Sequence, residues 1–212
     1  MEKNFRTVCF GELMLRLQPN LYTRFLQADT FEATFGGGEA NVSVSLANFG
    51  LDSAYVSKFP KHEIGQMAEN SLRYFGVDTS CVTRGGDRMG IYYIEKGASV
   101  RPSKVIYDRA YSAIALAERS DFDWEKILDG ADWFHFTGIT PGLTDKTAAL
   151  TLYACKKAKE MGLTVSCDLN YRSRLWSKED ARRVMTKVSR YTDVMITNMD
   201  QAFDVLGIKP GD

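Results

Sequence analysis

The sequence predicts an α/β fold in which a central, mainly parallel sheet is flanked by helices and carries a small β flap. After Asp121, strand-like and helix-like segments alternate, which is typical of parallel strands joined by crossover helices. A run of glycines at residues 36–38 leads directly into a helical pattern. Two β-rich arms within residues 90–109 flank a turn region with no core-forming helix between them, and this pattern predicts a projecting hairpin.

In the first half of the chain, short apolar runs alternate with helical periodicity. The run at residues 7–17 begins apolar enough for a buried strand, whereas the alternation at 30–35 indicates a half-exposed one. Apolar residues then recur with a period of 3.6, which is typical of helices that end at a glycine. The expected elements are strands at 7–17, 30–35 and 54–58 and helices at 39–50 and 64–76.

In the second half, each strand-like run is followed by a helical one. Ser177, with Asp180 three residues later, is a helix N-cap pattern. The expected elements are strands at 131–137, 163–169 and 193–197 and helices at 145–161, 177–190 and 199–206. A turn signal follows the last helix, and a sheet that stops there leaves an edge or a face bare. We therefore expect the fold to be incomplete at its C-terminal side.

Composition excludes several classes of protein. Among 212 residues, Lys plus Arg and Asp plus Glu are both 27, so no charge excess favours nucleic acid or a membrane surface. Four scattered cysteines lack the spacing of a disulfide framework or a zinc site, which favours a reducing compartment. The first residues lack a long apolar segment, and no apolar run is long enough to cross a membrane. The sequence predicts a cytoplasmic protein without nucleic-acid or membrane partners.

Most common enzyme signatures are absent. No Gly-Lys dipeptide exists, so a phosphate-binding loop of the Walker type is excluded, and Asn41 replaces the last glycine of a dinucleotide fingerprint. Only His62 and His135 are present, which leaves no histidine-rich metal site. His135 lies within a strand-like run and is interpreted as a core residue. We therefore predict no metal-ligating residue in this chain.

Five pieces nevertheless occur in a recognisable order. They are Gly11-Glu12 in the opening strand, F-G-G-G-E-A-N at 35–41, G-I-Y-Y at 90–93, D-L-N-Y-R at 168–172 and an N-x-x-x motif starting at Asn198. Together they resemble the ribokinase-like (pfkB-type) carbohydrate kinases over nearly the whole chain. The resemblance implies phosphorylation of a sugar with ATP and Mg²⁺. Each piece alone is better explained as a plain turn or helix cap.

The resemblance also implies the site residues. Glycines before a helix leave the backbone open to a ligand, and the helix N-terminus offers unpaired N–H groups. Tyr92 should face the sugar, and Tyr93 should face away from it. The implied substrate-binding residues are Gly36, Gly37, Gly38, Asn41, Tyr92, Tyr107, Arg109, Ile139 and Arg172. The implied nucleotide-binding residues are Asn170, Tyr171, Arg172 and Asn198.

Arginines favour a sugar acid as substrate. A guanidinium forms two charge-assisted hydrogen bonds with a carboxylate, and Arg109 and Arg172 resemble positions used in kinases of 2-keto-3-deoxygluconate. Arg16 stands where relatives that act on neutral sugars often have Asp, although Arg16 alone is better explained as a solvated ion-pair partner. The alternatives are a kinase of another sugar, such as fructose, and a catalytically inactive sugar-binding fragment.

Three departures from the family pattern matter. Gln201 replaces a Glu that relatives tie to Mg²⁺, and Tyr111 replaces a small residue. The G-A-G-D motif, which supplies the family's Asp base, lies further along than residue 212, so no catalytic residue is predicted here. We expect residues 1–212 to be the N-terminal portion of a kinase domain, with lid strands from about 12–35 and 88–110. The resemblance also implies a homodimer that pairs through the lid.

Overall fold

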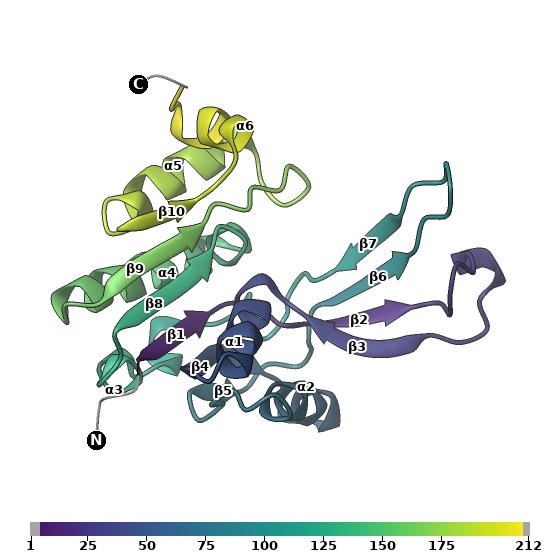
Figure 1. Cartoon of the computed structure of the whole chain (residues 1–212), viewed down its shortest axis with the longest axis horizontal. Coiled ribbons are helices and arrows are strands. Elements are labelled where there is room, and N and C mark those ends of the chain that lie inside the picture. Colours follow the sequence, from purple (N-terminus) through teal and green to yellow (C-terminus); the bar gives the residue numbers. More distant parts are fainter. Residues whose placement is uncertain (1–4, 210–212) are drawn as a thin grey trace.

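Two sheets organise the computed structural model, which describes residues 5–209. Figure 1 shows the smaller sheet projecting sideways from the larger one. The six-stranded sheet is parallel and has the order β10-β9-β8-β1-β4-β5, with β1 (Arg6–Phe10), β4 (Asp52–Phe59), β5 (Val82–Arg84), β8 (Trp133–Thr137), β9 (Thr164–Asp168) and β10 (Val194–Ile196). The four-stranded sheet is mixed and has the order β3-β2-β6-β7, with β2 (Met14–Gln18), β3 (Glu32–Gly36), β6 (Ile91–Glu95) and β7 (Lys104–Asp108).

Helices cover both faces of the large sheet because its strands are apolar on both sides. The helices are α1 (Gly38–Asn48), α2 (Glu63–Arg73), α3 (Trp124–Leu128), α4 (Asp145–Glu160), α5 (Lys178–Ser189) and α6 (Met199–Gln201). Val8 and Phe10 of β1 pack in a cluster with α3, α4 and α5, whereas Cys9, between them, packs in a second cluster with α1 and α2. Short turns are η1 (Phe25–Gln27), η2 (Arg119–Asp121), η3 (Thr140–Gly142) and η4 (Ala202–Leu206), the last of π type.

The predicted α/β architecture is confirmed, including the alternation of strands and helices in the second half. Ser177 caps α5 as its sequence pattern indicates, because its side chain accepts a hydrogen bond from the backbone N–H of Asp180. The hairpin predicted within residues 90–109 is formed by β6 and β7. No helix within residues 5–209 is long and apolar enough to span a membrane.

The single strand predicted at residues 7–17 is wrong. It is two strands in two sheets, and the chain crosses between them at residues 11–13. Gly11 still donates to Val56 of the large sheet, whereas Leu15 already donates to Gly90 of the small one. Apolar periodicity does not reveal this crossing because both halves of the run are buried. A Cβ on Gly11 would lie 2.2 Å from the carboxyl carbon of Glu39, so only glycine fits at the crossing.

Three smaller differences concern short or edge elements. The first three residues of β3 are all exposed rather than alternately exposed and buried, because β3 is an edge strand of the small sheet. The short elements β5 and α3 were not predicted, since three and five residues carry too little periodicity. The helix predicted at 199–206 is a single α-helical turn, α6, that continues as the π-helical η4.

Candidate functional site

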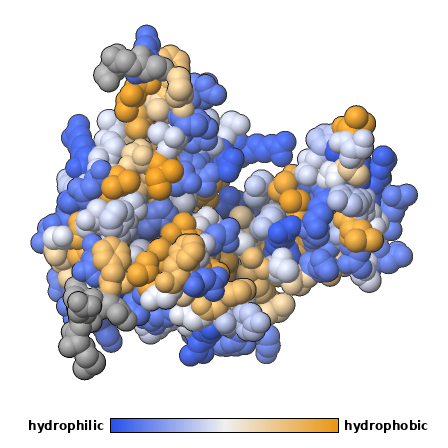
Figure 2. Space-filling model, in the orientation of Figure 1, coloured by the Kyte–Doolittle hydropathy of each residue, from blue (hydrophilic) through white to orange (hydrophobic). Residues whose placement is uncertain are grey.

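A cavity of about 990 Å³ lies where the two sheets meet. Figure 2 shows the hollow between the body of the molecule and the projecting lobe. Its walls come from the crossing at residues 11–14, the start of α1, the facing side of β6 and β7, the end of β8 and the loop between β9 and α5. The large-sheet contributions come from the carboxyl ends of parallel strands, where open α/β sheets bind their ligands.

Most of the predicted residues line this cavity. They are Gly36, Gly37, Gly38, Asn41, Tyr92, Tyr107, Arg109, Ile139, Asn170, Tyr171 and Arg172. Asn198 does not line it. The Asn198 side chain instead accepts a hydrogen bond from the N–H of Gln201 at 2.8 Å and caps α6. The sequence does not distinguish these two roles, because an Asp or Asn side chain at the start of a helix can either cap the helix or bind a ligand.

The tyrosines of the small sheet face the cavity from neighbouring strands. Tyr92 and Tyr107 are directly paired across β6 and β7, with ring centroids 6.2 Å apart. Tyr93 lies on the opposite side, against the ring of Phe31, as the strand alternation predicts. Burial raises the pKa of Tyr92, so its hydroxyl keeps its proton and can donate a hydrogen bond. In the described part of the chain, neither of the paired phenols has a hydrogen-bond partner.

Arg109 is already paired within the protein. Its guanidinium donates to one carboxylate oxygen of Glu12, and Ser112 donates to the other at 2.8 Å. The Glu12 side chain is 1% exposed and that of Arg109 is 15% exposed, so this ion pair is nearly sheltered from water. A buried carboxylate paired in this way compensates the charge of the arginine. Arg109 therefore contributes surface and hydrogen-bond donors to the cavity wall but adds little net positive charge.

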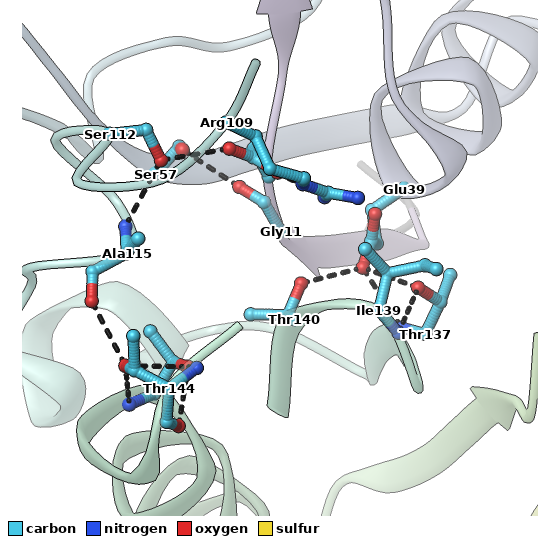
Figure 3. Close-up of polar contacts among 12 residues, drawn as sticks. Gly11, Glu39, Ser57, Arg109, Ser112, Ala115, Thr137, Ile139, Thr140 and Thr144 are labelled. Carbon is cyan, nitrogen blue, oxygen red and sulfur yellow. Dashed lines mark hydrogen bonds and ion pairs between the residues drawn. The ribbon is translucent and has the colours of Figure 1, made fainter. Parts of the chain in front are cut away.

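A second buried acid organises the other side. Glu39, in the first turn of α1, accepts three hydrogen bonds on Oε1, from the N–H of Thr137 and the hydroxyls of Thr137 and Thr140, at 2.9 to 3.0 Å (Figure 3). Thr137 in turn accepts from the N–H of Ile139. Burial raises the pKa of Glu39, although the threonine hydrogen bonds oppose that shift. The network holds the turn after β8 against the start of α1.

This network limits the backbone contact to a ligand that was predicted for Ile139. Its N–H is used by Thr137, and its carbonyl accepts from Gly142 at 3.0 Å. A ligand can therefore reach only the second lone pair of that carbonyl or the apolar side chain. By contrast, Asn41 lines the cavity and its side-chain amide makes no hydrogen bond to any described residue, so its donors and acceptor are available to a ligand.

The loop between β9 and α5 forms the wall farthest along the chain. Asn170 has a positive φ of 38°, a conformation that Asn tolerates better than most residues, and its N–H donates to Asp168. The next N–H, of Tyr171, donates to Oε1 of Gln201 at 3.1 Å. Gln201, which stands where the family pattern has Glu, therefore has a structural role here, because its side chain connects this loop to α6.

Two further departures can be located in the structure. Tyr111 has a φ of 58°, a left-handed conformation that glycine and asparagine adopt more readily than tyrosine. Arg16 does not line the cavity and donates to Gln18 rather than to an acid. No three His, Cys, Asp or Glu side chains of residues 5–209 converge as a metal site would require. Mg²⁺ is commonly held by one or two carboxylates together with the phosphates of a nucleotide, so no Mg²⁺ ligand is assigned among the described residues.

Nine residues of the cavity were not predicted from the sequence, and the charged ones among them are Glu12, Glu39, Asp108 and Arg174. The two glutamates carried a signal, since each is a charged residue directly after a glycine in an otherwise apolar segment. An acid in such a segment is either paired or protonated once it is buried. Arg174 carried no signal, because arginine in a polar loop is common.

The fold and the cavity define an α/β protein with a polar cavity at the carboxyl ends of its parallel strands, and comparison with known proteins identifies the family. Residues 4–210 match the pfkB family of carbohydrate kinases, so the chain belongs to that family. Its fold is that of the ribokinase-like kinases.

Three relatives illustrate the similarity. The crystal structure of 2-dehydro-3-deoxygluconokinase from Thermotoga maritima is 54% identical and superposes with a TM-score of 0.95, over 98% of this chain and 64% of that one. The 2-dehydro-3-deoxygalactonokinase of Haloferax volcanii is 37% identical over 89% of this chain and 59% of its own length. The probable chloroplastic fructokinase-6 of Arabidopsis thaliana is 30% identical over 97% and 54%. The chain thus spans less than two thirds of the length of each of these three relatives.

Proposed function

We propose that this protein is part of a kinase that transfers the γ-phosphoryl group of ATP to 2-keto-3-deoxygluconate, giving the 6-phosphate. The observation that carries this proposal is the single cavity that collects residues from six separate segments of the chain. It combines free phenol and amide groups, which suit sugar hydroxyls, with arginines, which suit a carboxylate. The similarity to the Thermotoga maritima 2-dehydro-3-deoxygluconokinase supports the same substrate.

In this proposal the chain supplies recognition rather than the chemical step. The phenols of Tyr92 and Tyr107 and the amide of Asn41 bind hydroxyl groups, and the glycines at 36–38 let the sugar approach the backbone. The loop at 170–172 faces the nucleotide. The family resemblance implies that the Asp base belongs to the G-A-G-D segment. Phosphoryl transfer also requires donors that stabilise the negative charge of the transition state, so we assign the chemical step to the whole kinase.

A fructose kinase is the alternative within the same family. The Arabidopsis thaliana fructokinase relative favours it, and the phenol and amide groups of the cavity bind neutral sugars equally well. The other alternative is a sugar-binding fragment without turnover. It follows from the short span of the chain relative to its relatives.

We also propose that the kinase acts in the cytoplasm and pairs as a homodimer through the small sheet, which then acts as a lid over the sugar. The exposed strands β3 and β7 support pairing, because uncovered strands tend to associate. The closeness of the paired tyrosines to the cavity supports a lid. Elution of the native protein as a monomer would contradict the dimer.

The test of function is ATP turnover and equilibrium sugar binding by this chain, with 2-keto-3-deoxygluconate, fructose and ribose offered side by side in the presence of Mg²⁺. Selective ADP release with the sugar acid is the expected result if the chain is competent. Preference for fructose would establish the alternative substrate. Selective binding of the sugar acid without ADP release would establish the fragment, and binding of none of the sugars would overturn the proposal.

A further inference from the structure

Some of the charged side chains that line the cavity are neutralised by a partner of opposite charge, and others are not. Arg109 is paired with Glu12, and Asp108 is paired with Arg88 at 2.8 Å. Glu39 is held by threonine donors and has a raised pKa. The two remaining lining cations are Arg172 and Arg174, and neither forms an ion pair with an acid in the part of the chain that the structure describes. The uncompensated positive charge of the cavity therefore lies on one loop, between β9 and α5.

The backbone that carries these two arginines is fixed. The N–H groups of Leu175 and Trp176 both donate to the carbonyl of Arg172, at 2.9 and 3.4 Å, which closes a turn around Arg174. The hydroxyl of Tyr171 donates to the carbonyl of Trp176 at 3.2 Å and fastens the two ends of the same turn. A loop anchored in this way presents its side chains from a defined position at little entropic cost.

The side chain of Arg174 reaches from the large-sheet wall of the cavity to the small sheet. Its Nη1 donates to the carbonyl of Val105 in β7, an edge strand, at 3.4 Å. That distance is at the long end for an N–H···O hydrogen bond, and a guanidinium has five N–H donors. Most of its donor capacity is therefore unused, while its position spans the two walls that a bound sugar would touch.

We propose that Arg174 is a specificity-determining residue that pairs with the carboxylate of the acceptor sugar acid and couples its binding to the position of β7. This inference rests on the proposed function, which supplies the anionic substrate. A carboxylate accepts two charge-assisted hydrogen bonds from one guanidinium, which a neutral sugar does not. Arg109 is less suited to this task, because Glu12 already compensates its charge.

The test is calorimetric binding of 2-keto-3-deoxygluconate and fructose to the 212-residue chain and its variants. Arg174→Ala should weaken binding of the sugar acid by about 10- to 100-fold, the range expected for a hydrogen-bonded charge pair. Binding of fructose should change by less than about twofold, because no charge pair is lost. Arg174→Lys, which keeps the charge but loses the fork, should recover part of the affinity.

The matched control is Arg73→Ala, which removes an exposed arginine of α2 that does not line the cavity. It should leave both affinities unchanged. Equal weakening of sugar acid and fructose by Arg174→Ala would reduce the residue to a structural contact and overturn the inference. Unchanged binding of the sugar acid would overturn it as well, while leaving the proposed function in place. If the unsubstituted chain binds fructose but not the sugar acid, both the proposed substrate and this inference fail.

Discussion

The two sheets of this protein are stabilised in different ways. In the large sheet, strands β1 and β8 are buried along almost their whole length and sit between two layers of helices. In the small sheet, β3 and β7 are largely exposed. The small sheet is anchored instead by polar contacts at its ends, from Glu12 to Arg109 at the cavity and from Glu95 to Arg101 and the N–H of Phe25 at the far end.

This difference means that the two walls of the cavity are held in place by different interactions. The large sheet is rigid because close packing leaves its strands one arrangement. The small sheet depends instead on a few directional contacts, so the loss of one of them should disturb its position relative to the cavity. One wall of the cavity is therefore held by close packing and the other by a few polar contacts.

The comparison predicts its largest effect in the core. Phe136→Ala in β8 removes a fully buried ring that stacks on Phe134, and should lower the free energy of unfolding by about 3–5 kcal/mol. Ile106→Ala in β7, where the side chain is 45% exposed, should cost less than about 1 kcal/mol. Urea denaturation followed by circular dichroism measures both. Equal losses would show that the two sheets share one core.

The second prediction concerns the anchor between the sheets. Glu12→Ala leaves the guanidinium of Arg109 without its buried partner and should cost about 3 kcal/mol. The control is Glu125→Ala, which removes a 77% exposed acid paired with Lys157 and should cost less than about 1 kcal/mol. Denaturation midpoints at fixed salt give both values. A loss for Glu12→Ala no larger than the control would mean that the small sheet does not depend on this pair.

The third prediction is that Glu39, on the large-sheet side of the cavity, makes the stability of the protein depend on pH. Burial raises its pKa, so the folded protein keeps the proton to a higher pH than the unfolded chain, whose ordinary value is 4.5. The contribution of this group to stability is complete below pH 4.5 and declines as pH rises towards the folded pKa. Glu39→Gln cannot ionise, so its stability relative to the natural protein should rise across that range, by at most about 1.4 kcal/mol per pH unit. Parallel stability curves from pH 4 to 8 would contradict the raised pKa.

The smallest expected effect is at Asn198, beyond the cavity. Asn198→Ala removes the N-cap of α6 and should cost about 1 kcal/mol, whereas Asn198→Asp keeps a capping oxygen and should cost little. Neither variant should change sugar affinity in calorimetric titration. A loss of nucleotide binding in Asn198→Asp, with stability intact, would support the nucleotide-binding role predicted from the sequence.

Much of the site was predictable because its signals are local. Glycines at 36–38 before a helix, alternating tyrosines on a strand and polar residues at the end of β9 can each be found in a short stretch of sequence. The partners of those residues were not predictable. Arg109 and Glu12 are 97 positions apart, and Thr137 and Glu39 are 98 apart, so no local pattern relates them.

The sequence by itself determined the alternation of strands and helices, the hairpin of the small sheet and many of the side chains that line the cavity, because propensity and periodicity act over a few residues. The tertiary structure decided that the first apolar run divides between two sheets at Gly11 and that Asn198 caps a helix. It also decided which charges are compensated: Glu12 neutralises Arg109, while Arg172 and Arg174 remain without an acid among the described residues. Compensation of charge depends on distances through space, which only the folded chain fixes.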